Sequence, residues 1–412
     1  MNSDKSSTPH ILLVGKSRKK HVAAHGLGYR LSAVMTISQF KTTDTSFYER
    51  AVAVSDDATT MEWVAAAKHI SQFVEFNALG VFSEPLEHIG IEIGHSLNLP
   101  YLPKSQIEFA KDKYLMRSKL KEFGIENTYS RMLDFPFDEA IRQVLLFQKG
   151  AIIVKPYDGV SSRGVSLVQS EDDIPEAIDW ALASGIDSGL VAETYLQGPE
   201  YSIEMISHNG FHQLVAVTEK IKDEIHFVEL GHTIPANISI KVREKLSKHV
   251  ELILCAIGHI TGPSHTEVIL TEDGARLVEI HFRIGGDDID LLCELTTGLD
   301  MNKVWVQQLL NEYNCNGLKY IEHEGVAGVR FSVASDTGVL TGVTGIDLAR
   351  SIPGVHSIKQ LISDGEIVSK LRDSTSRVLS VIAHAPDRSK LERIFKKVDS
   401  LIDIRFENVQ NK

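Results

Sequence analysis

Two glutamates stand where a β-hairpin would bring them together. Between residues 265 and 283, apolar and polar residues alternate on both sides of the turn-forming segment 272–274, as in two strands joined by a short loop. A register that pairs Thr271 with Ala275 sets Glu267 directly opposite Glu279. Carboxylates about 5 Å apart repel each other unless a cation lies between them. The pair therefore predicts a site for a hard divalent cation, Mg²⁺ with Mn²⁺ as an alternative.

The same register brings other polar groups to this face of the hairpin. His265 would face His281, and Arg283 would follow further along. The opposite face would pack in the core through Val268, Val278, Ile280 and Phe282. The simpler alternative is a pair of solvent-facing glutamates on an exposed sheet. The histidines and the arginine on the same face make this alternative less favoured.

Two lysines are placed to meet phosphate groups. Lys113 falls in a predicted helix over residues 105–123, and Lys155 ends a predicted strand just before the loop 157–164. That loop is rich in glycine and serine, including Ser161 and Ser162, and such loops present N–H groups and hydroxyls to anions. The chain has no GxxxxGK[ST] segment, which excludes a P-loop. Taken alone, a lysine in such a position is more often a surface charge than a ligand.

The segment 191–204 reads as a strand, a break at Gly198-Pro199, and a second strand. A connection of this kind can offer backbone groups to the edge of an adenine ring, and a nearby carboxylate can accept hydrogen bonds from ribose hydroxyls. An ordinary link between two strands would have the same pattern, so the segment gains meaning only from its neighbours.

Taken together, these motifs resemble the ATP-grasp carboxylate–amine ligases in order and spacing. The resemblance covers nearly the whole chain and rests on Lys113, Lys155 with its Gly-Ser loop, Glu193-Thr194-Tyr195-Leu196 with Glu200, and Glu267 with Glu279-x-x-x-Arg283. The segments 158–164, 198–200, 262–267 and 283–286 look most like those of bacterial L-amino-acid ligases, which form dipeptides.

The resemblance implies a role for each motif. The residues implied to bind ATP are Lys113 and Lys155 at the α- and β-phosphates, Glu193 with the backbone of Tyr195 and Leu196 at adenine, and Glu200 at the ribose. Glu267 and Glu279 would hold Mg²⁺. Ser161 and Ser162 would close over the γ-phosphate, and Arg283 would stabilise the acyl phosphate and the tetrahedral intermediate.

One position departs from the family pattern. Many ATP-grasp enzymes carry asparagine two residues after the second metal-binding glutamate, whereas this chain has His281. Histidine prefers softer metals than Mg²⁺, so His281 could ligate a metal, contact phosphate through water, or do neither.

Three further residues are candidates for substrate binding. Glu84 follows a predicted strand at the carboxyl end of a parallel sheet, where such sheets usually bind ligands. His232 lies in a Gly-His…Pro-Ala segment similar to one found in related ligases, and Gly286 follows Arg283. A helix-capping Glu84 and a structural His232 are the alternatives.

The pattern around these residues predicts an α/β (α+β) chain of three domains. Strands are predicted at 11–15, 33–37, 51–54 and 80–83, with helices at 19–31, 60–77 and 87–97, which is typical of a Rossmann-like parallel sheet. We expect this pre-ATP-grasp domain over 1–104. The ATP-grasp domain would occupy 105–315, in two subdomains (105–196 and 197–315), and a β-rich domain 316–412.

Composition narrows the function classes. The net charge of −12 argues against a nucleic-acid partner, because binding to phosphate backbones needs clustered lysine and arginine. No apolar run approaches the length that crosses a bilayer, so no membrane partner and a cytoplasmic location are expected. Small-molecule substrates, namely amino acids, are the expected partners, and a homodimer is left open.

These observations favour a ligase that uses ATP to activate the carboxylate of one L-amino acid and joins it to the amine of another. The alternative enzyme is another ATP-grasp ligase or carboxylase, acting on a purine precursor or bicarbonate. The non-enzyme alternative, a regulatory nucleotide-binding module with a decayed site, is disfavoured by the joint presence of Lys113, Lys155, Glu267, Glu279 and Arg283.

Overall fold

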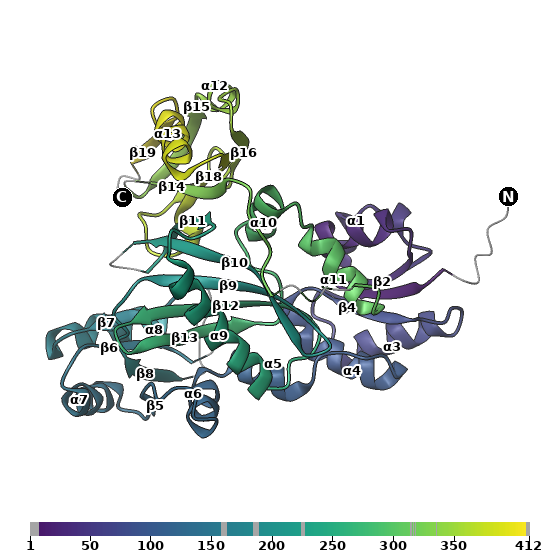
Figure 1. The fold of residues 1–412 in the computed structure, drawn as a ribbon, viewed down its shortest axis with the longest axis horizontal. Coiled ribbons are helices and arrows are strands. Elements are labelled where there is room, and N and C mark those ends of the chain that lie inside the picture. Colours follow the sequence, from purple (N-terminus) through teal and green to yellow (C-terminus); the bar gives the residue numbers. More distant parts are fainter. Residues whose placement is uncertain are drawn as a thin grey trace.

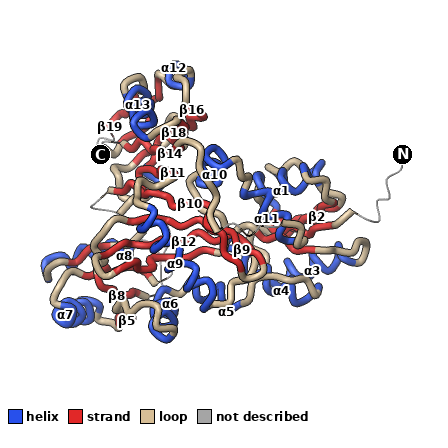
Figure 2. Tube along the Cα trace, viewed as in Figure 1, coloured by secondary structure: helices blue, strands red, loops and turns tan. Residues whose placement is uncertain are grey.

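The computed structural model describes residues 8–157, 163–183, 189–223, 227–313, 315, 317, 319–334 and 336–408. Figure 1 shows the N-terminal unit on one side of a large central sheet, a smaller unit around α7 and β5 below it, and the C-terminal strands above it. Helices and strands alternate at both ends of the chain, and long strands dominate the middle, as Figure 2 shows. The fold is mixed α/β, as the sequence predicts.

The N-terminal unit is a four-stranded parallel sheet in the order β3-β2-β1-β4. Its strands are β1 (His10–Val14), β2 (Arg30–Thr36), β3 (Arg50–Val54) and β4 (Ala78–Val81). Its helices are α1 (Arg18–Gly26), α2 (Ile37–Lys41), α3 (Thr60–Ser71) and α4 (Glu87–Leu97), with the 3₁₀ turns η1 (Thr45–Phe47) and η2 (Glu84–Leu86). The predicted helix over 19–31 is too long, because Gly28 adopts a positive φ of 84° and β2 begins two residues later.

The next unit begins with two helices where the sequence predicts one. α5 (Lys104–Lys111) ends at Asp112, whose extended backbone breaks the helix and whose side chain caps α6 (Lys113–Glu122) by accepting from the Leu115 N–H. A sheet follows in the order β5-β8-β6-β7. It comprises β5 (Ser130–Leu133), β6 (Ile152–Pro156), β7 (Ser166–Val168) and β8 (Leu190–Thr194), with α7 (Phe137–Gln148), η3 (Glu171–Asp173) and α8 (Ile174–Ala183) packed against it.

An eight-stranded sheet forms the centre of the molecule, in the order β13-β12-β9-β10-β11-β14-β18-β16. Its first five strands are β9 (Glu200–His208), β10 (Phe211–Lys222), β11 (Glu229–Ile234), β12 (Gly262–Thr271) and β13 (Gly274–His281). Helix α9 (Ile240–Ala256) packs on them. Helices α10 (Ile289–Thr297) and α11 (Met301–Leu309) share one apolar core with strands of the N-terminal unit.

The strands after residue 316 continue this sheet. β14 (Val326–Val333) pairs with β11, and β18 (Arg377–Ala385) and β16 (Val355–Gln360) follow. A second small sheet, β17-β15-β19, is built from β15 (Gly338–Thr344), β17 (Ile367–Val368) and β19 (Asp403–Asn408). The helices of this region are α12 (Ile346–Arg350), α13 (Arg388–Asp399) and the 3₁₀ turn η4 (Ser374–Ser376).

Among the described residues, no helix is both long enough and apolar enough to cross a membrane.

Candidate active site

The β12–β13 hairpin places the two glutamates as the sequence predicts, but by a different route. Glu267 pairs with Glu279, as predicted, whereas at the turn Thr271 pairs with Gly274 rather than with Ala275. The one-residue difference is absorbed by a bulge beside Glu267, where Val268 pairs with Leu277 and Val278 is the extra residue.

The bulge also corrects the predicted core face of the hairpin. Val268, Ile280 and Phe282 are buried in the core as predicted, but Leu277 joins them in place of Val278. Val278 instead lines a cavity on the other face, beside Glu279. One inserted residue therefore turns both the apolar wall and the carboxylate pair toward the same space.

That cavity has a volume of about 1070 Å³, large enough for a nucleotide and a small substrate. Its walls come from both sheets: Lys155 and Glu193 from the four-stranded sheet, and Lys220, Glu267 and Glu279 from the eight-stranded one. Apolar side chains share the lining, namely Ile153, Val165, Leu196, Ile269 and Val278. An apolar wall beside charged groups suits a ligand that combines an aromatic base with phosphates.

Each glutamate of the pair has a lysine beside it. Lys220 Nζ lies 2.8 Å from Glu267 Oε2, and Lys113 Nζ lies 3.4 Å from Glu279 Oε1. Burial raises the pKa of Glu279, but Lys113 and His281 outweigh it and lower that pKa to about 2. Burial likewise opposes ionisation of Glu267, yet Lys220 and His265 hold its pKa well below the usual value. Both groups are therefore carboxylates at neutral pH.

The donor chemistry of this pair fits Mg²⁺. Two ionised carboxylates meet across one hairpin, and hard oxygen donors are the ligands that this ion prefers. A buried support fixes one of them: His265 binds Glu204 at 2.9 Å through Nδ1 and lies 3.4 Å from Glu267 through Nε2. Such outer partners commonly orient metal-binding carboxylates.

His281, Glu84 and Arg283 form a chain of contacts that starts at Glu279. His281 Nε2 lies 3.6 Å from Glu279 Oε2, and His281 Nδ1 lies 3.3 Å from Glu84 Oε2. The same Glu84 oxygen accepts a 2.8 Å hydrogen bond from Arg283 Nε. Burial raises the pKa of Glu84, but His281 and Arg283 lower it far more. Glu84 therefore connects the N-terminal unit to the side chains around the pair Glu267 and Glu279.

Lys155 is held by a buried acidic partner. Its Nζ lies 2.6 Å from Glu193 Oε2, and Arg117 Nε lies 3.0 Å from Glu193 Oε1. Although burial opposes ionisation, Arg117 and Lys155 lower the pKa of Glu193 to about 2. Both oxygens of Glu193 are thus engaged by cations in this structure, while the predicted adenine neighbours Tyr195 and Leu196 lie on the cavity wall just beyond the end of β8.

Glu200, the predicted ribose contact, belongs to a second cluster of charges. It contacts Lys220 at 2.7 Å and also Lys222, and it lines the cavity. The side chain of Lys220 is only 3% exposed and joins three carboxylates, because it also lies 2.8 Å from both Glu229 and Glu267.

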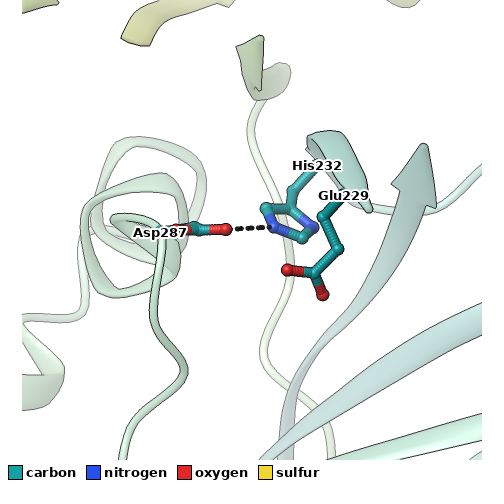
Figure 3. A group of neighbouring side chains, drawn as sticks. All are labelled: Glu229, His232 and Asp287. Carbon is teal, nitrogen blue, oxygen red and sulfur yellow. Dashed lines mark hydrogen bonds and ion pairs between the residues drawn. The ribbon is translucent and has the colours of Figure 1, made fainter. Parts of the chain in front are cut away.

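A third group gathers around the predicted substrate residue His232. Figure 3 shows His232 pointing toward Asp287, with the Glu229 carboxylate beside them. His232 Nε2 lies 3.2 Å from Asp287 Oδ2, and ligand-type atoms of Glu229, His232 and Asp287 all lie within 4.8 Å of one another. Gly286, the third predicted substrate residue, lines the same cavity, and a Cβ on it would meet no atom within 4 Å.

The cavity therefore brings together Lys113, Lys155, Glu193, Tyr195, Leu196, Glu200, Glu267, Glu279, Arg283, Glu84, His232 and Gly286. Ser161 and Ser162, the predicted γ-phosphate contacts, lie outside the described residues.

Sequence reasoning missed Arg117, Lys220, Asp287 and Arg377. For two of them a local signal existed. Arg117 follows Lys113 by four residues on α6, which puts both on one helix face, and Lys220 and Lys222 are two apart on β10, which puts both on one face of the strand. The other two come from a loop and from β18, which no local pattern connects.

Two known protein families match parts of the chain. Residues 148–290 match the family model of the ATP-grasp domain, and residues 330–407 match L-amino acid ligase C-terminal domain 2. An uncharacterized protein of Sinorhizobium fredii is 28% identical over 255 residues, which are 61% of this chain and 52% of that protein. A D-alanine–D-alanine ligase of Flavobacterium johnsoniae is 26% identical over 193 residues, which are 44% of this chain and 58% of that ligase. The chain thus spans about half the length of these relatives.

Among solved structures, an L-amino acid ligase from Bacillus licheniformis superposes with a TM-score of 0.82. The alignment covers 97% of this chain and 99% of that one at 19% identity, which shows a shared fold. The fold and the family match define the class of the central unit: residues 148–290 form an ATP-grasp domain, the domain of enzymes that use ATP together with Mg²⁺. The chain also carries an L-amino acid ligase C-terminal domain over residues 330–407.

Proposed function

We propose that this protein is an ADP-forming ligase that couples two L-amino acids to a dipeptide. The observation that carries the proposal is the Glu267–Glu279 pair, which shares one cavity with Lys113, Lys155 and Arg283. Support comes from the D-alanine–D-alanine ligase relative and from the L-amino acid ligase C-terminal domain.

The chemistry explains why ATP is needed. A free carboxylate is a poor electrophile, so it must first take the γ-phosphoryl group of ATP, which gives an acyl phosphate and ADP. The amine of the second amino acid then attacks the acyl carbon, the C–O bond to phosphate breaks, and the amine loses a proton. Phosphoryl transfer of this kind asks a protein mainly for alignment and charge neutralisation.

The residues of the cavity supply both. Lys113 and Lys155 would neutralise the phosphates of ATP, with Lys155 aligned by Glu193, and the apolar wall around Val278 would take the base. Glu267 and Glu279 would hold Mg²⁺, which supplies further neutralisation of the phosphate oxygens. Ser161 and Ser162 are proposed to contact the γ-phosphate.

Arg283 would stabilise the negative charge that develops on the acyl phosphate and on the tetrahedral intermediate. Its link to Glu84 gives Glu84 a role in orienting Arg283, in addition to the proposed contact with an amino-acid substrate. His232 and Gly286 are proposed to form another part of that substrate site.

We also propose the domain division 1–104, 105–315 and 316–412, in which β14, β18 and β16 belong to the C-terminal domain although they extend the central sheet.

A pairwise screen tests the proposal. Single amino acids and pairs are incubated with ATP and Mg²⁺, and ADP, phosphate and dipeptide are measured. We expect ADP release that requires an amino acid pair and matches dipeptide in amount. ADP release that instead depends on a purine precursor or bicarbonate would replace the amino-acid assignment with the alternative ATP-grasp function.

A further inference from the structure

One arginine of the C-terminal domain reaches the cavity. Arg377, the first residue of β18, lines it and is only 6% exposed. Its guanidinium stacks on the ring of Phe331 in β14 at 4.0 Å. Stacking fixes the plane of a guanidinium and thereby the direction of its N–H groups.

Arg377 joins the two carboxylates of the His232 group. Its Nη1 lies 2.8 Å from Asp287 Oδ2, and its Nη2 lies 3.3 Å from Glu229 Oε2. His232 contacts the same Asp287 oxygen at 3.2 Å. Because both contacts use Oδ2, the other oxygen of Asp287 can accept a hydrogen bond from a ligand.

The backbone that carries Asp287 needs such support. Asp287 and Asp288 both have left-handed backbone conformations, with φ of 51° and 58°. Residues other than glycine rarely adopt this conformation, and it persists only where neighbouring groups hold the residue in place. Asp288 is held at 2.8 Å by Lys19 of the N-terminal unit and at 3.1 Å by Lys359 of β16. Arg377 supplies the corresponding hold on Asp287.

Among the described residues, two buried nitrogen atoms of this group have no partner: Nε of Arg377 and Nδ1 of His232. Unpaired buried donors and acceptors are costly and call for an explanation. A ligand or water that enters the group would supply it.

We propose that Arg377 is a positioning residue for the amino-acid substrate. It aligns Asp287 and Glu229 at the cavity wall and so fixes the polar contacts that receive the substrate's ammonium group. The inference rests on the proposed function, since it assumes that an amino acid occupies this part of the cavity. It also gives the C-terminal domain a part in substrate binding.

The test compares Arg377→Met and Arg377→Lys with Arg388→Met. Arg388 is a fair control because it is another arginine of the C-terminal domain that pairs with a carboxylate of the central sheet, Glu219 at 2.6 Å, but it does not line the cavity. For Arg377→Met we expect the KM of an amino acid to rise at least about tenfold while the KM of ATP stays within about twofold. Arg377→Lys should fall between this variant and wild type, because an ammonium cannot engage both carboxylates with the same fork of donors.

A double-variant cycle separates positioning from general stability. The double variant Arg377→Met with Asp287→Asn is compared with the two single variants. If Arg377 acts through Asp287, the fold increase in the KM of the amino acid in the double variant should be smaller than the product of the two single fold increases. Arg388→Met should lower Tm without changing either KM. Equal KM values in the Arg377 and Arg388 variants, or independent effects of Arg377 and Asp287, would overturn the inference.

Hydrogen exchange gives a readout that needs no activity. Peptides spanning residues 284–288 should exchange faster in Arg377→Met than in Arg388→Met, and unchanged exchange there would also overturn the inference. If wild type releases ADP with no amino acid pair, the proposed function fails, whereas normal turnover with unchanged exchange and KM in Arg377→Met removes the positioning role alone.

Discussion

At the carboxylate pair, each glutamate is neutralised separately. Glu267 has Lys220 and Glu279 has Lys113, so the repulsion expected from sequence is already relieved by two lysines. Two carboxylates without nearby cations would repel each other, and removing one of them would then raise stability in the absence of Mg²⁺. Because each glutamate here has a lysine beside it, we expect no such gain in stability. Removing one glutamate should instead leave a buried lysine with one partner fewer.

Glu267→Gln and Glu279→Gln should each abolish measurable ADP formation, because an amide is a much weaker ligand for Mg²⁺ than a carboxylate. Glu272→Gln, at the exposed turn of the same hairpin, should keep wild-type activity. The measurement is ADP release with saturating substrates, together with Tm to show that the variants fold. Near wild-type turnover in both site variants would remove the metal assignment.

Arg283→Lys should lower kcat at least about tenfold and leave the KM of ATP within about twofold, because lysine lacks the planar guanidinium that donates from Nε to Glu84 and from Nη1 to the Ile284 carbonyl. Glu84→Gln should lower kcat in the same direction, since it loosens Arg283. The exposed Glu92→Gln on α4 serves as the control. A weakened KM for ATP with unchanged kcat would instead place Arg283 in the nucleotide site.

The buried Glu193 should make stability depend on pH. Its pKa falls from an ordinary value of 4.5 to about 2 in the folded protein. The stabilisation is therefore complete above pH 4.5 and is lost as the pH falls toward 2. It amounts to about 3 kcal/mol.

The check is urea unfolding between pH 3 and pH 7. Glu193→Gln should lose roughly 3–5 kcal/mol at pH 7, because Arg117 and Lys155 lose their buried partner, and it should show a shallower pH dependence than wild type. Glu122→Gln, whose partner Lys119 is exposed, is the control. Parallel pH profiles for wild type and Glu193→Gln would contradict this assignment.

Among the secondary-structure elements, the β12–β13 hairpin shows how far a sequence pattern reaches. Alternation located both strands and the Glu267–Glu279 pair correctly. It could not reveal the bulge at Val278, because valine suits either face and no glycine marks the irregularity. Outside the ladder, the edge backbone of Leu277 is bound by the side chains of Glu126 and Arg117, which come from a distant part of the chain.

Deleting Val278 should test the bulge. Without the extra residue, the register set at the turn would run on unbroken, so Val268 would still pair with Leu277 and Glu267 with Glu279. We therefore expect ADP formation to persist with a higher KM of ATP, because the cavity wall loses the Val278 side chain, and Val278→Ala should raise that KM in the same direction. A deletion variant that forms no ADP would show that the bulge itself, and not the pairing alone, places Glu279.

The break between α5 and α6 was missed for a related reason. Lys111-Asp112-Lys113 suits a helix interior by polarity, and only the capping contact from Asp112 to the Leu115 N–H marks the new start. The new start makes Lys113 the first residue of α6 and puts Arg117 one turn later on the same face. From this face Lys113 contacts Glu279, and Arg117 contacts Glu193.

At the scale of the whole molecule, charged contacts connect all three proposed domains around the cavity. Glu84 of the first domain meets Arg283, and Arg377 of the third meets Asp287. The third domain also reaches the unit of the sheet β5-β8-β6-β7, where Arg372 stacks on Trp180 of α8 at 3.9 Å. Such contacts join residues far apart in sequence, so the motifs predict an ATP site but not the contacts of the C-terminal domain around the same cavity.

Dipeptide ligation is tested most directly by a stoichiometric assay with purified wild-type protein, ATP, Mg²⁺ and pairs of L-amino acids, in which ADP and dipeptide are quantified together. We expect one ADP for each dipeptide formed, no product when either amino acid is omitted, and none with Glu279→Gln. ADP formation that is independent of amino acids, or dipeptide formation that survives in Glu279→Gln, would contradict it.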